Sequence, residues 1–339
     1  MAYHYTTRFG ELFPAAASPW HFELGAYGVH LFFMISGFVI MMTLDRSKRV
    51  SDFLVARFSR LFPTYWMAIL ITTALLWAFN GPIEILATRD IVANFSMLEG
   101  FFNVPLVDGV YWTLQIELLF YVAALAVFSM GLMRRIDWIA LGWLVLSASF
   151  LSPLTAPYLA QVPHANALAM LLNLEYAPFF VIGIAFYRIY EPRGPTLWSY
   201  AIAAAALAVV AATHSASVTA LAVMGCVVFA LLAHRGSSVL RSAPLVFIGM
   251  ISYPLYLIHQ KIGYACMLAL REGGWDGLIS MAAATILSLT LATLLTLAVE
   301  RPAMHAIREW HKTRRRLQPQ PNPVLSQVIP GAARSELRQ

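Results

Sequence analysis

The sequence predicts an all-α membrane protein, a bundle of transmembrane helices, from its apolar content, its low charge and its long uncharged segments. Of the 339 residues, 60% are hydrophobic and 12% are charged, and the mean hydropathy is +0.68. Soluble domains carry about 25% charged residues, so this chain has too few polar side chains to cover a water-exposed surface. We therefore expect a polytopic protein whose main surroundings are the lipid bilayer.

Nine segments are apolar and long enough, at roughly 20 residues, to cross a bilayer as helices. The connections between them are short, apart from residues 81–110 and 154–171, so no soluble domain fits between the spans. The nine predicted spans are residues 25–44, 62–80, 111–131, 136–153, 172–189, 197–213, 216–234, 244–269 and 276–299.

The basic residues gather at alternate ends of these spans. The connections after the first, third, fifth and seventh spans, with the adjoining span ends and the C-terminal tail, hold 19 of the 23 Lys and Arg residues. Because Lys and Arg are retained on the cytoplasmic side, this pattern predicts a multi-pass protein of the inner (plasma) membrane with a cytoplasmic C-terminus. Residues 81–110 then face outward.

The N-terminal end does not fit this count. Nine spans and a cytoplasmic C-terminus place residues 1–24 outside, yet the chain starts with the apolar-aromatic segment Met1 to Tyr5 and shows no signal peptide. We expect a further helix that ends near His4, with residues 1–5 as its last turn, lost through a start site placed too late or a truncated chain. The alternative is nine spans preceded by a re-entrant or interfacial segment.

The predicted tail, residues 306–339, is basic at first and then rich in Pro, Gln and Ser. That second part is expected to be disordered, which leaves residues 1–305 as the transmembrane domain. Much of the formal net charge of +6 follows the last span directly, so it indicates juxtamembrane anchoring, and no nucleic acid partner is expected. Cys226 and Cys266 lie in apolar segments, so neither a disulfide nor a metal site is predicted.

A few ionisable residues fall at membrane depth, where a functional role is the first hypothesis; Glu117 and His259 are the main ones, and His30 lies nearer the outer end of its span. Glu117 lies about two turns from the outer end of its span, and an interhelical hydrogen bond is the alternative role. His259 shares one helical face with Ser252 and Tyr256, near Pro254, whose freed carbonyls need partners. This polar face should point into the bundle or a wet cavity. The alternative is a buried histidine satisfied by its own helix.

Two further sites carry chemistry. Arg57 and Arg60 are three residues apart at a predicted helix start, an arrangement that suits phosphate groups; the positive-inside pattern and lipid headgroups account for the same pair. His4 has the side chain best suited to accept a proton near neutral pH. The sequence contains no Gly-rich phosphate loop, no metal-ligand cluster, no HExxH motif and no nucleophile elbow.

Taken together, four motifs resemble the acyltransferase-3 family, membrane O-acyltransferases that decorate bacterial surface polysaccharides and related acceptors. Glu300-Arg301-Pro302, which closes the last span, is also typical, and the matches cover about residues 1–305 in the family's order. The four motifs are Gly28 to Phe38 (GVxLFFxISGF), Arg57 to Tyr65 (RxxRLxPxY), Trp112 to Tyr121 (WxLxxExxFY) and Ser252 to His259 (SYPLYLxH).

The resemblance implies ten helices with both termini in the cytoplasm. It also implies a donor substrate, acetyl-CoA or another short acyl-CoA, that approaches from the cytoplasm, with its phosphates on Arg57 and Arg60. No bound cofactor is implied. The acceptor would be a hydroxyl group of a carbohydrate, either a polysaccharide or a glycolipid.

In this family the first helix carries an Arg, ten intervening residues and a His thought to be catalytic, and His4 matches that His. The chain has no Arg at that spacing before His4, and His30 stands where members often have an acidic residue. The resemblance makes His4 the general base toward the acceptor, with Glu117 as the group that orients it. Direct attack on the thioester and relayed transfer across the bundle both remain open. The residues expected to line the same cavity are Ser252, Tyr253 and His259.

Two other functions fit the sequence. A proton-coupled transporter or flippase would use Glu117, His259 and Lys261 as a proton relay and would do no CoA chemistry. An inactive scaffold is the natural fate of a chain truncated before its first helix. In-frame codons upstream of Met1 would discriminate, because an apolar helix with the family's Arg there indicates a late start site.

Overall fold

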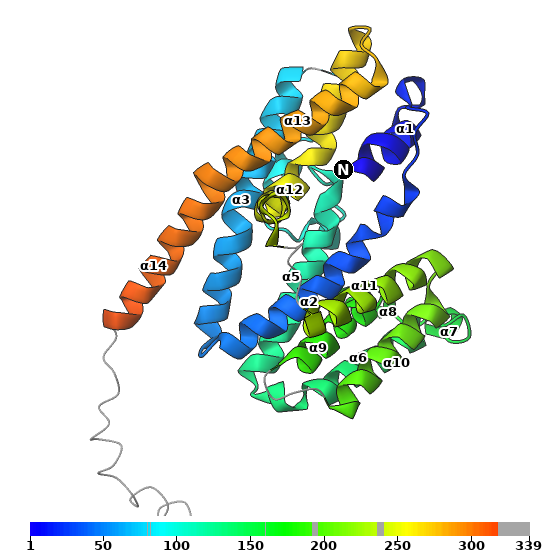
Figure 1. Cartoon of the computed structure of the whole chain (residues 1–339), viewed down its shortest axis with the longest axis vertical. Coiled ribbons are helices and arrows are strands. Elements are labelled where there is room, and N and C mark those ends of the chain that lie inside the picture. Colours follow the sequence, from blue (N-terminus) through cyan, green and yellow to red (C-terminus); the bar gives the residue numbers. More distant parts are fainter. Residues whose placement is uncertain (80, 82, 160, 192–195, 236–240, 318–339) are drawn as a thin grey trace, which may run out of the picture.

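The computed structural model is helical throughout the residues it describes, which are 1–339 except 80, 82, 160, 192–195, 236–240 and 318–339 (Figure 1). No β-strand occurs in these described ranges. The predicted fold class, an all-α bundle of apolar helices, is confirmed.

Each predicted apolar segment contains a helix. Most boundaries lie within a few residues of the predicted ones, but α3 begins 12 residues before the predicted position. The helices are α2 (Gly28–Arg46), α3 (Val50–Phe79), α5 (Trp112–Ser129), α6 (Ile136–Leu151), α9 (Ala177–Tyr190), α10 (Leu197–Thr213), α11 (Ala216–Arg235), α12 (Ala243–Glu272) and α13 (Gly277–Leu295), which continues through η8 (Thr296–Glu300) into α14 (Arg301–Leu317).

Length and composition qualify five of these helical stretches as membrane spans, so the predicted count of nine is not confirmed. Three further apolar helices are shorter than a full span: Ala177–Tyr190, Leu197–Thr213 and Ala216–Leu232. The five long stretches are Glu23–Arg46, Val50–Phe79, Gly109–Ser129, Ala243–Glu272 and Gly277–Leu317.

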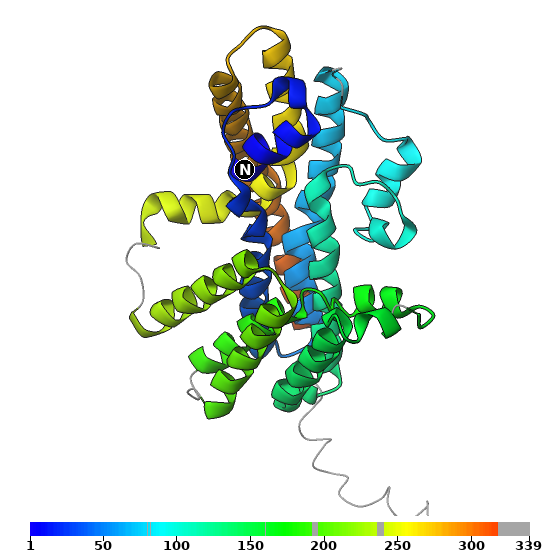
Figure 2. The same ribbon diagram turned by 90° about the vertical axis from the view of Figure 1, so that its right-hand side faces the viewer.

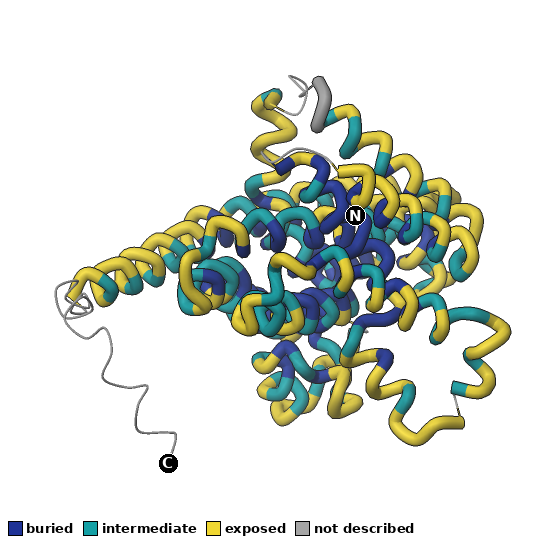
Figure 3. Tube along the Cα trace, turned by 90° about the horizontal axis from the view of Figure 1, so that it is seen from below, coloured by how far each residue is buried: buried dark blue, intermediate teal, exposed yellow. Residues whose placement is uncertain are grey.

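The helices form two groups joined by α2 and α5 (Figures 1 and 2). One group contains α3, α12, α13 and α14; the other contains α6, α9, α10 and α11. Helix α2 packs against α9 and α5, and α5 packs in turn against α3. Buried residues gather in the middle of this arrangement, while the outer faces of the helices are exposed (Figure 3). Residues at the junction therefore come from distant parts of the chain.

Two glycines allow α2 and α9 to touch. A Cβ atom at Gly37 would collide with the carbonyl oxygen of Phe180, and one at Gly183 would collide with that of Met34. Small residues let membrane helices approach closely, so this pair fixes α2 against α9. Gly37 is the glycine of the ISGF motif, which gives that motif a packing role.

Helix α12 changes direction along its length: its first part runs across the molecule and its second part runs along the long axis (Figures 1 and 2). Pro254 lies inside this helix and cannot donate to the carbonyl one turn earlier, a common cause of a bend. Two backbone groups of the same helix have partners outside it. Lys261 donates its N–H to Asp108 Oδ2 at 2.9 Å, and the His259 carbonyl accepts from the Tyr5 hydroxyl at 2.7 Å.

Short helices occupy the connections. Residues 81–110 contain Asn94, whose amide binds the Pro105 carbonyl and the Val107 N–H, both at 2.9 Å, so residues 94–107 of this connection are folded together. The short helices are η1 (His4–Arg8), α1 (Phe9–Leu12), η2 (Pro14–Ala16), η3 (Glu23–Tyr27), α4 (Thr88–Asn94), η4 (Glu99–Phe102), η5 (Gly109–Tyr111), η6 (Leu132–Arg135), α7 (Ala156–Leu159) and α8 (Ala165–Leu171).

The predicted helix end near His4 is wrong, because the helix continues through η1 and α1 to Leu12. Both elements lie against α12 and α13. Tyr5 and Phe9 form a small apolar core there with Tyr264, Met267 and Leu268. At the other end of the chain, the basic start of the predicted tail is helical as part of α14. Disorder was predicted for residues 317–339; Leu317 is instead the last residue of α14, and residues 318–339 lie outside the described residues.

Candidate functional site

A cavity of about 360 Å³ lies at the junction of α2, α3, α5 and α12; we call it the Glu117 cavity. Sequence reasoning drew its candidate residues from separate motifs, and the fold brings five of them to this one cavity. They are Arg57, Arg60, Glu117, Ser252 and Tyr253. His4 and His259 do not line it.

Glu117 is buried on α5, with 7% of its surface exposed. Its Oε1 accepts hydrogen bonds from the Ser36 hydroxyl of α2, at 3.2 Å, and from the Tyr121 hydroxyl one turn further along α5. Buried carboxylates need such donors because burial without partners is costly. The interhelical bond that the sequence left as an alternative role is therefore present, and it leaves the carboxylate facing the cavity.

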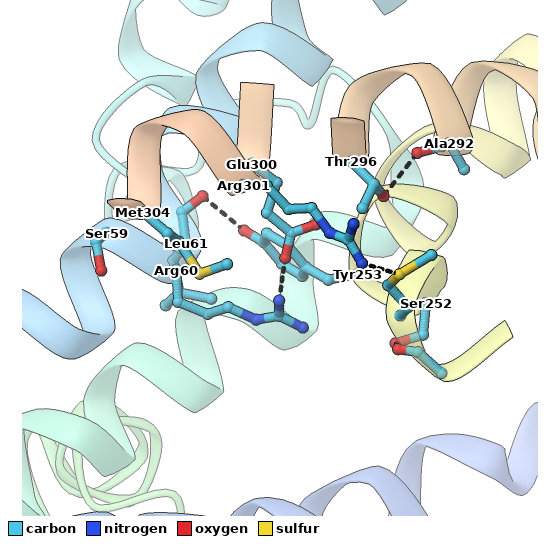
Figure 4. Close-up of polar contacts among 12 residues, drawn as sticks. Ser59, Arg60, Leu61, Ser252, Tyr253, Ala292, Thr296, Glu300, Arg301 and Met304 are labelled. Atoms are coloured by element: carbon cyan, nitrogen blue, oxygen red, sulfur yellow. Dashed lines mark hydrogen bonds and ion pairs between the residues drawn. The ribbon is translucent and has the colours of Figure 1, made fainter. Parts of the chain in front are cut away.

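Arg60 pairs with a carboxylate from the far end of the chain. Its guanidinium forms an ion pair with Glu300, whose side chain is fully buried at the end of η8 (Figure 4). The same guanidinium lies over the Tyr253 ring, 5.7 Å from the centroid, and the Tyr253 hydroxyl donates to the Leu61 carbonyl at 2.9 Å. Arg60 therefore supports the cavity wall, and its charge is already paired with that of Glu300.

Arg57 has a different environment. Its guanidinium donates to the Thr43 hydroxyl and lies over the rings of Tyr121 and Phe53, 5.6 and 5.9 Å from their centroids. Its Nε atom is buried and has no hydrogen-bond partner among the described residues. Because α3 begins at Val50, Arg57 and Arg60 lie well inside this helix, which corrects the predicted position at a helix start.

Tyr256 forms the cavity wall toward the N-terminal segment. Its hydroxyl donates to the Val110 carbonyl at 2.8 Å and lies 2.5 Å from the Thr113 hydroxyl. Ser252, on the same helix, donates to the Gly249 carbonyl at 2.8 Å. The two hydroxyl groups thus bind backbone carbonyls while their side chains line the cavity.

His4 and His259 meet beyond Tyr256, in a group that we call the His4 cluster (His4, His259 and Tyr264). The two imidazole rings lie edge to face with centroids 5.0 Å apart, and the Tyr264 hydroxyl is 3.4 Å from His4 Nδ1. His259 Nδ1 lies 3.0 and 2.9 Å from the carbonyls of Leu255 and Tyr256. We assign the proton to Nδ1, because a carbonyl can only accept.

That assignment leaves His259 Nε2 as a lone-pair acceptor. The atom is buried and has no partner among the described residues. Tyr5 holds the neighbouring backbone in place, because its hydroxyl binds the His259 carbonyl and Ser288 Oγ, at 2.7 and 2.8 Å. Tyr5 reaches this position against Gly263, where a Cβ atom would collide with the ring. The residue after His4 thus fixes His4 beside His259.

The expected contact between Glu117 and His4 is not formed among the described residues. Glu117 binds Ser36 and Tyr121, whereas the ring of His259 lies 5.0 Å from that of His4 and 6.1 Å from that of Tyr256. His259 is thus the neighbour of His4, and Tyr256, which contacts the His259 ring, lines the same cavity as Glu117.

Asp108 fastens the start of α5 to α12. Its carboxylate is fully buried and accepts from the N–H groups of Val110 and Lys261, at 3.2 and 2.9 Å. Burial raises the pKa of Asp108 to about 6. The two N–H donors have the opposite effect on the pKa, because they favour the charged carboxylate. The Lys261 ammonium faces the Leu106 carbonyl at 3.4 Å. It does not join Glu117 in the proton relay that a transporter would use.

His30 lies apart from the Glu117 cavity and from the His4 cluster. Its ring is 4.6 Å from that of Phe179 and 6.3 Å from that of His214. Within the described part of the chain, no three His, Cys, Asp or Glu residues come together as a metal site.

Several functional neighbours were missed by sequence reasoning. Ser36 and Tyr121 lie inside motifs that were recognised, and Tyr121 is four residues from Glu117, a spacing that predicts contact on a helix. Glu300 could also have been recognised from the sequence, because it is an acidic residue at the end of an apolar span. Nothing local indicated its partner Arg60, 240 residues earlier. Tyr5 carried no signal, because its partners belong to α12 and α13.

Comparison with known proteins identifies the family. A model of an acyltransferase domain matches residues 1–299. Nodulation protein 10 of Rhizobium leguminosarum bv. viciae is 29% identical over 84% of each chain. Acyltransferase MdmB of Streptomyces mycarofaciens is 27% identical over 84% of this chain and 82% of its own length. A shorter match, 36% identical, covers 35% of this chain and 38% of the exopolysaccharide production protein ExoZ of Rhizobium meliloti (strain 1021).

No solved structure matches this chain. The domain match nonetheless covers most of the sequence, from the His4 cluster through every helix that lines the Glu117 cavity. The chain belongs to the acyltransferase-3 family and is a membrane acyltransferase.

Proposed function

We propose that this protein moves an acetyl or other short acyl group from cytoplasmic acyl-CoA to a hydroxyl of a cell-surface polysaccharide or glycolipid. The observation that carries the proposal is the Glu117 cavity, which gathers residues from four helices, with the His4 cluster directly beyond Tyr256. The name of one relative, an exopolysaccharide production protein, supports this acceptor class, and the name of another, an acyltransferase, supports the reaction.

The chemistry requires a base and a polarised thioester. The acceptor hydroxyl loses its proton to the His4 imidazole while its oxygen bonds to the thioester carbonyl carbon. The carbon–sulfur bond breaks, and the CoA thiolate leaves and takes the proton back from His4. His259, edge-on to His4, supports its ring, and the guanidinium of Arg57 supplies positive charge at the cavity.

Two contacts support the proposed orientation, with the C-terminus in the cytoplasm. The basic connection between α2 and α3 and the basic α14 were both assigned to the cytoplasmic side, and Arg315 binds Asp52 at 2.8 Å. The start of α6 and the end of α9 were also assigned to the cytoplasmic side, and there Arg188 lies 3.3 Å from Asp137. Segments expected on one side of the membrane are thus in contact.

The test is acyl transfer by the purified chain in lipid nanodiscs. Labelled acetyl-CoA is supplied with cell-envelope glycan, and both CoA release and labelled glycan are measured. We expect labelled glycan, lost when His4 is replaced by Ala. Absence of acetyl-CoA turnover by the correctly folded chain would contradict the proposal.

A further inference from the structure

A second polar pocket lies beside the Glu117 cavity. It has a volume of about 470 Å³, within the range of about 300–1,000 Å³ that is usual for ligand sites. It is formed by the end of α2, the start of α3 and α14, and we call it the basic pocket. Its charged residues are Arg46, Lys48, Asp52 and Arg315.

The charge balance of the basic pocket favours an anion. Asp52 is already neutralised, since it accepts from Arg315 at 2.8 Å and lies 3.1 Å from His311 Nε2. Arg46 and Lys48 form no ion pair with any described residue. Helix α3 begins at Val50, so the positive end of its dipole adds to the same field. Two cations thus remain available to a ligand.

Thr43 connects this pocket to the Glu117 cavity. It lines the basic pocket and accepts a hydrogen bond from Arg57, which lines the Glu117 cavity. The Nε atom of the same Arg57 is buried and has no partner among the residues that the structure describes. Along α2, Arg46 is ten residues from Ser36, a separation of about 15 Å at 1.5 Å per residue.

We infer that the basic pocket binds the phosphate groups of the acyl-CoA donor, through Arg46 and Lys48. The extended pantetheine arm then passes Thr43 and Arg57 and carries the thioester through the Glu117 cavity toward the His4 cluster. This inference rests on the proposed function and changes its phosphate site, because Arg60 is held by Glu300. A lipid headgroup offers the same phosphate chemistry, so the experiment must separate the two.

The experiment measures the Kd of labelled acetyl-CoA for the full chain in phosphatidylcholine nanodiscs. Arg46→Gln and Lys48→Gln are each expected to weaken binding about tenfold, the effect of one lost charge-assisted contact. Arg49→Gln is the matched control, since Arg49 is an exposed cation of the same turn that does not line the pocket. Acetyl-pantetheine, which lacks the nucleotide phosphates, should bind the wild type and the variants equally.

Phosphatidylglycerol provides the lipid arm. We expect its addition to leave the acetyl-CoA Kd unchanged, and displacement of acetyl-CoA by this lipid would assign the pocket to headgroups and overturn the inference. Unaltered Kd values in both variants would also overturn it. Binding is measured apart from turnover: unaltered affinity with normal acyl transfer removes this site and leaves the proposed function intact. Weakened acetyl-CoA binding in the variants, with no acyl transfer by the wild type, would support this site and contradict the proposed function.

Discussion

The Glu117 cavity and the His4 cluster share helix α12, where Tyr253 and His259 are less than two turns apart, yet they differ in how their polar groups are satisfied. In the cavity, the Glu117 carboxylate has two hydroxyl donors and Arg60 has Glu300, and the atom without a partner among the described residues is a donor, Arg57 Nε. In the His4 cluster, a buried imidazole nitrogen of His259 has no partner among the described residues.

This difference separates two roles within one site. A carboxylate held by two donors from two helices, as Glu117 is, has a fixed position and supplies a fixed electrostatic environment. An unpartnered imidazole nitrogen retains the capacity to accept a hydrogen bond or a proton. We therefore expect loss of chemistry from changes in the His4 cluster, and a mixture of lost stability and lost activity from changes around the cavity.

The largest effect is expected for His4→Ala. Removal of a general base should lower kcat about 10³-fold while the Kd for acetyl-CoA is unchanged. Steady-state acyl transfer and equilibrium binding measure the two quantities. His21→Ala, an exposed histidine of the same N-terminal segment, serves as the control. A His4→Ala variant with wild-type kcat would contradict the assignment of the chemistry to the His4 cluster.

Glu117→Gln should lower kcat/KM by about 10²-fold, because the amide keeps the acceptor for Ser36 and Tyr121 but loses the negative charge. Ser36→Ala, which removes one donor only, is the milder comparison. A double variant with His259→Gln sharpens the test. If the two regions act independently, the fold loss of kcat/KM in the double variant equals the product of the losses in the two single variants. A strong departure from this product would show that the two regions act as one unit.

Arg60→Ala should destabilise the fold by about 2 kcal/mol, since it leaves the fully buried Glu300 unpaired; the partial exposure of Arg60 keeps the value below that of a dry ion pair. Denaturant unfolding in detergent measures the change. The double variant with Glu300→Gln should recover most of the loss. Equal stability of the single and double variants would contradict a structural ion pair.

The smallest effect is expected at the boundary between the two regions. Tyr256→Phe removes the bond to the Val110 carbonyl, worth about 1 kcal/mol of stability, while the ring stays in place. Acyl transfer should fall much less than in Glu117→Gln. Loss of transfer equal to that of His4→Ala would instead make the Tyr256 hydroxyl part of the chemistry.

The sequence by itself determined the membrane class, the position of each apolar helix and most of the candidate residues. These are local properties: hydropathy over about 20 residues marks a helix in lipid, and an ionisable side chain inside such a segment marks a candidate site. Helix α3 was the main error, because its first three turns, from Val50, are too polar to register as apolar.

Only the tertiary structure decided which candidates meet. It placed Arg60 on Glu300, joined Glu117 to Ser36 and set His4 beside His259. These pairs depend on the contact of Gly37 with α9 and on the bend of α12, which orient whole helices. Helix orientation arises from packing between segments far apart in the chain. Local periodicity cannot encode it, because a helical face is the same whichever neighbour covers it.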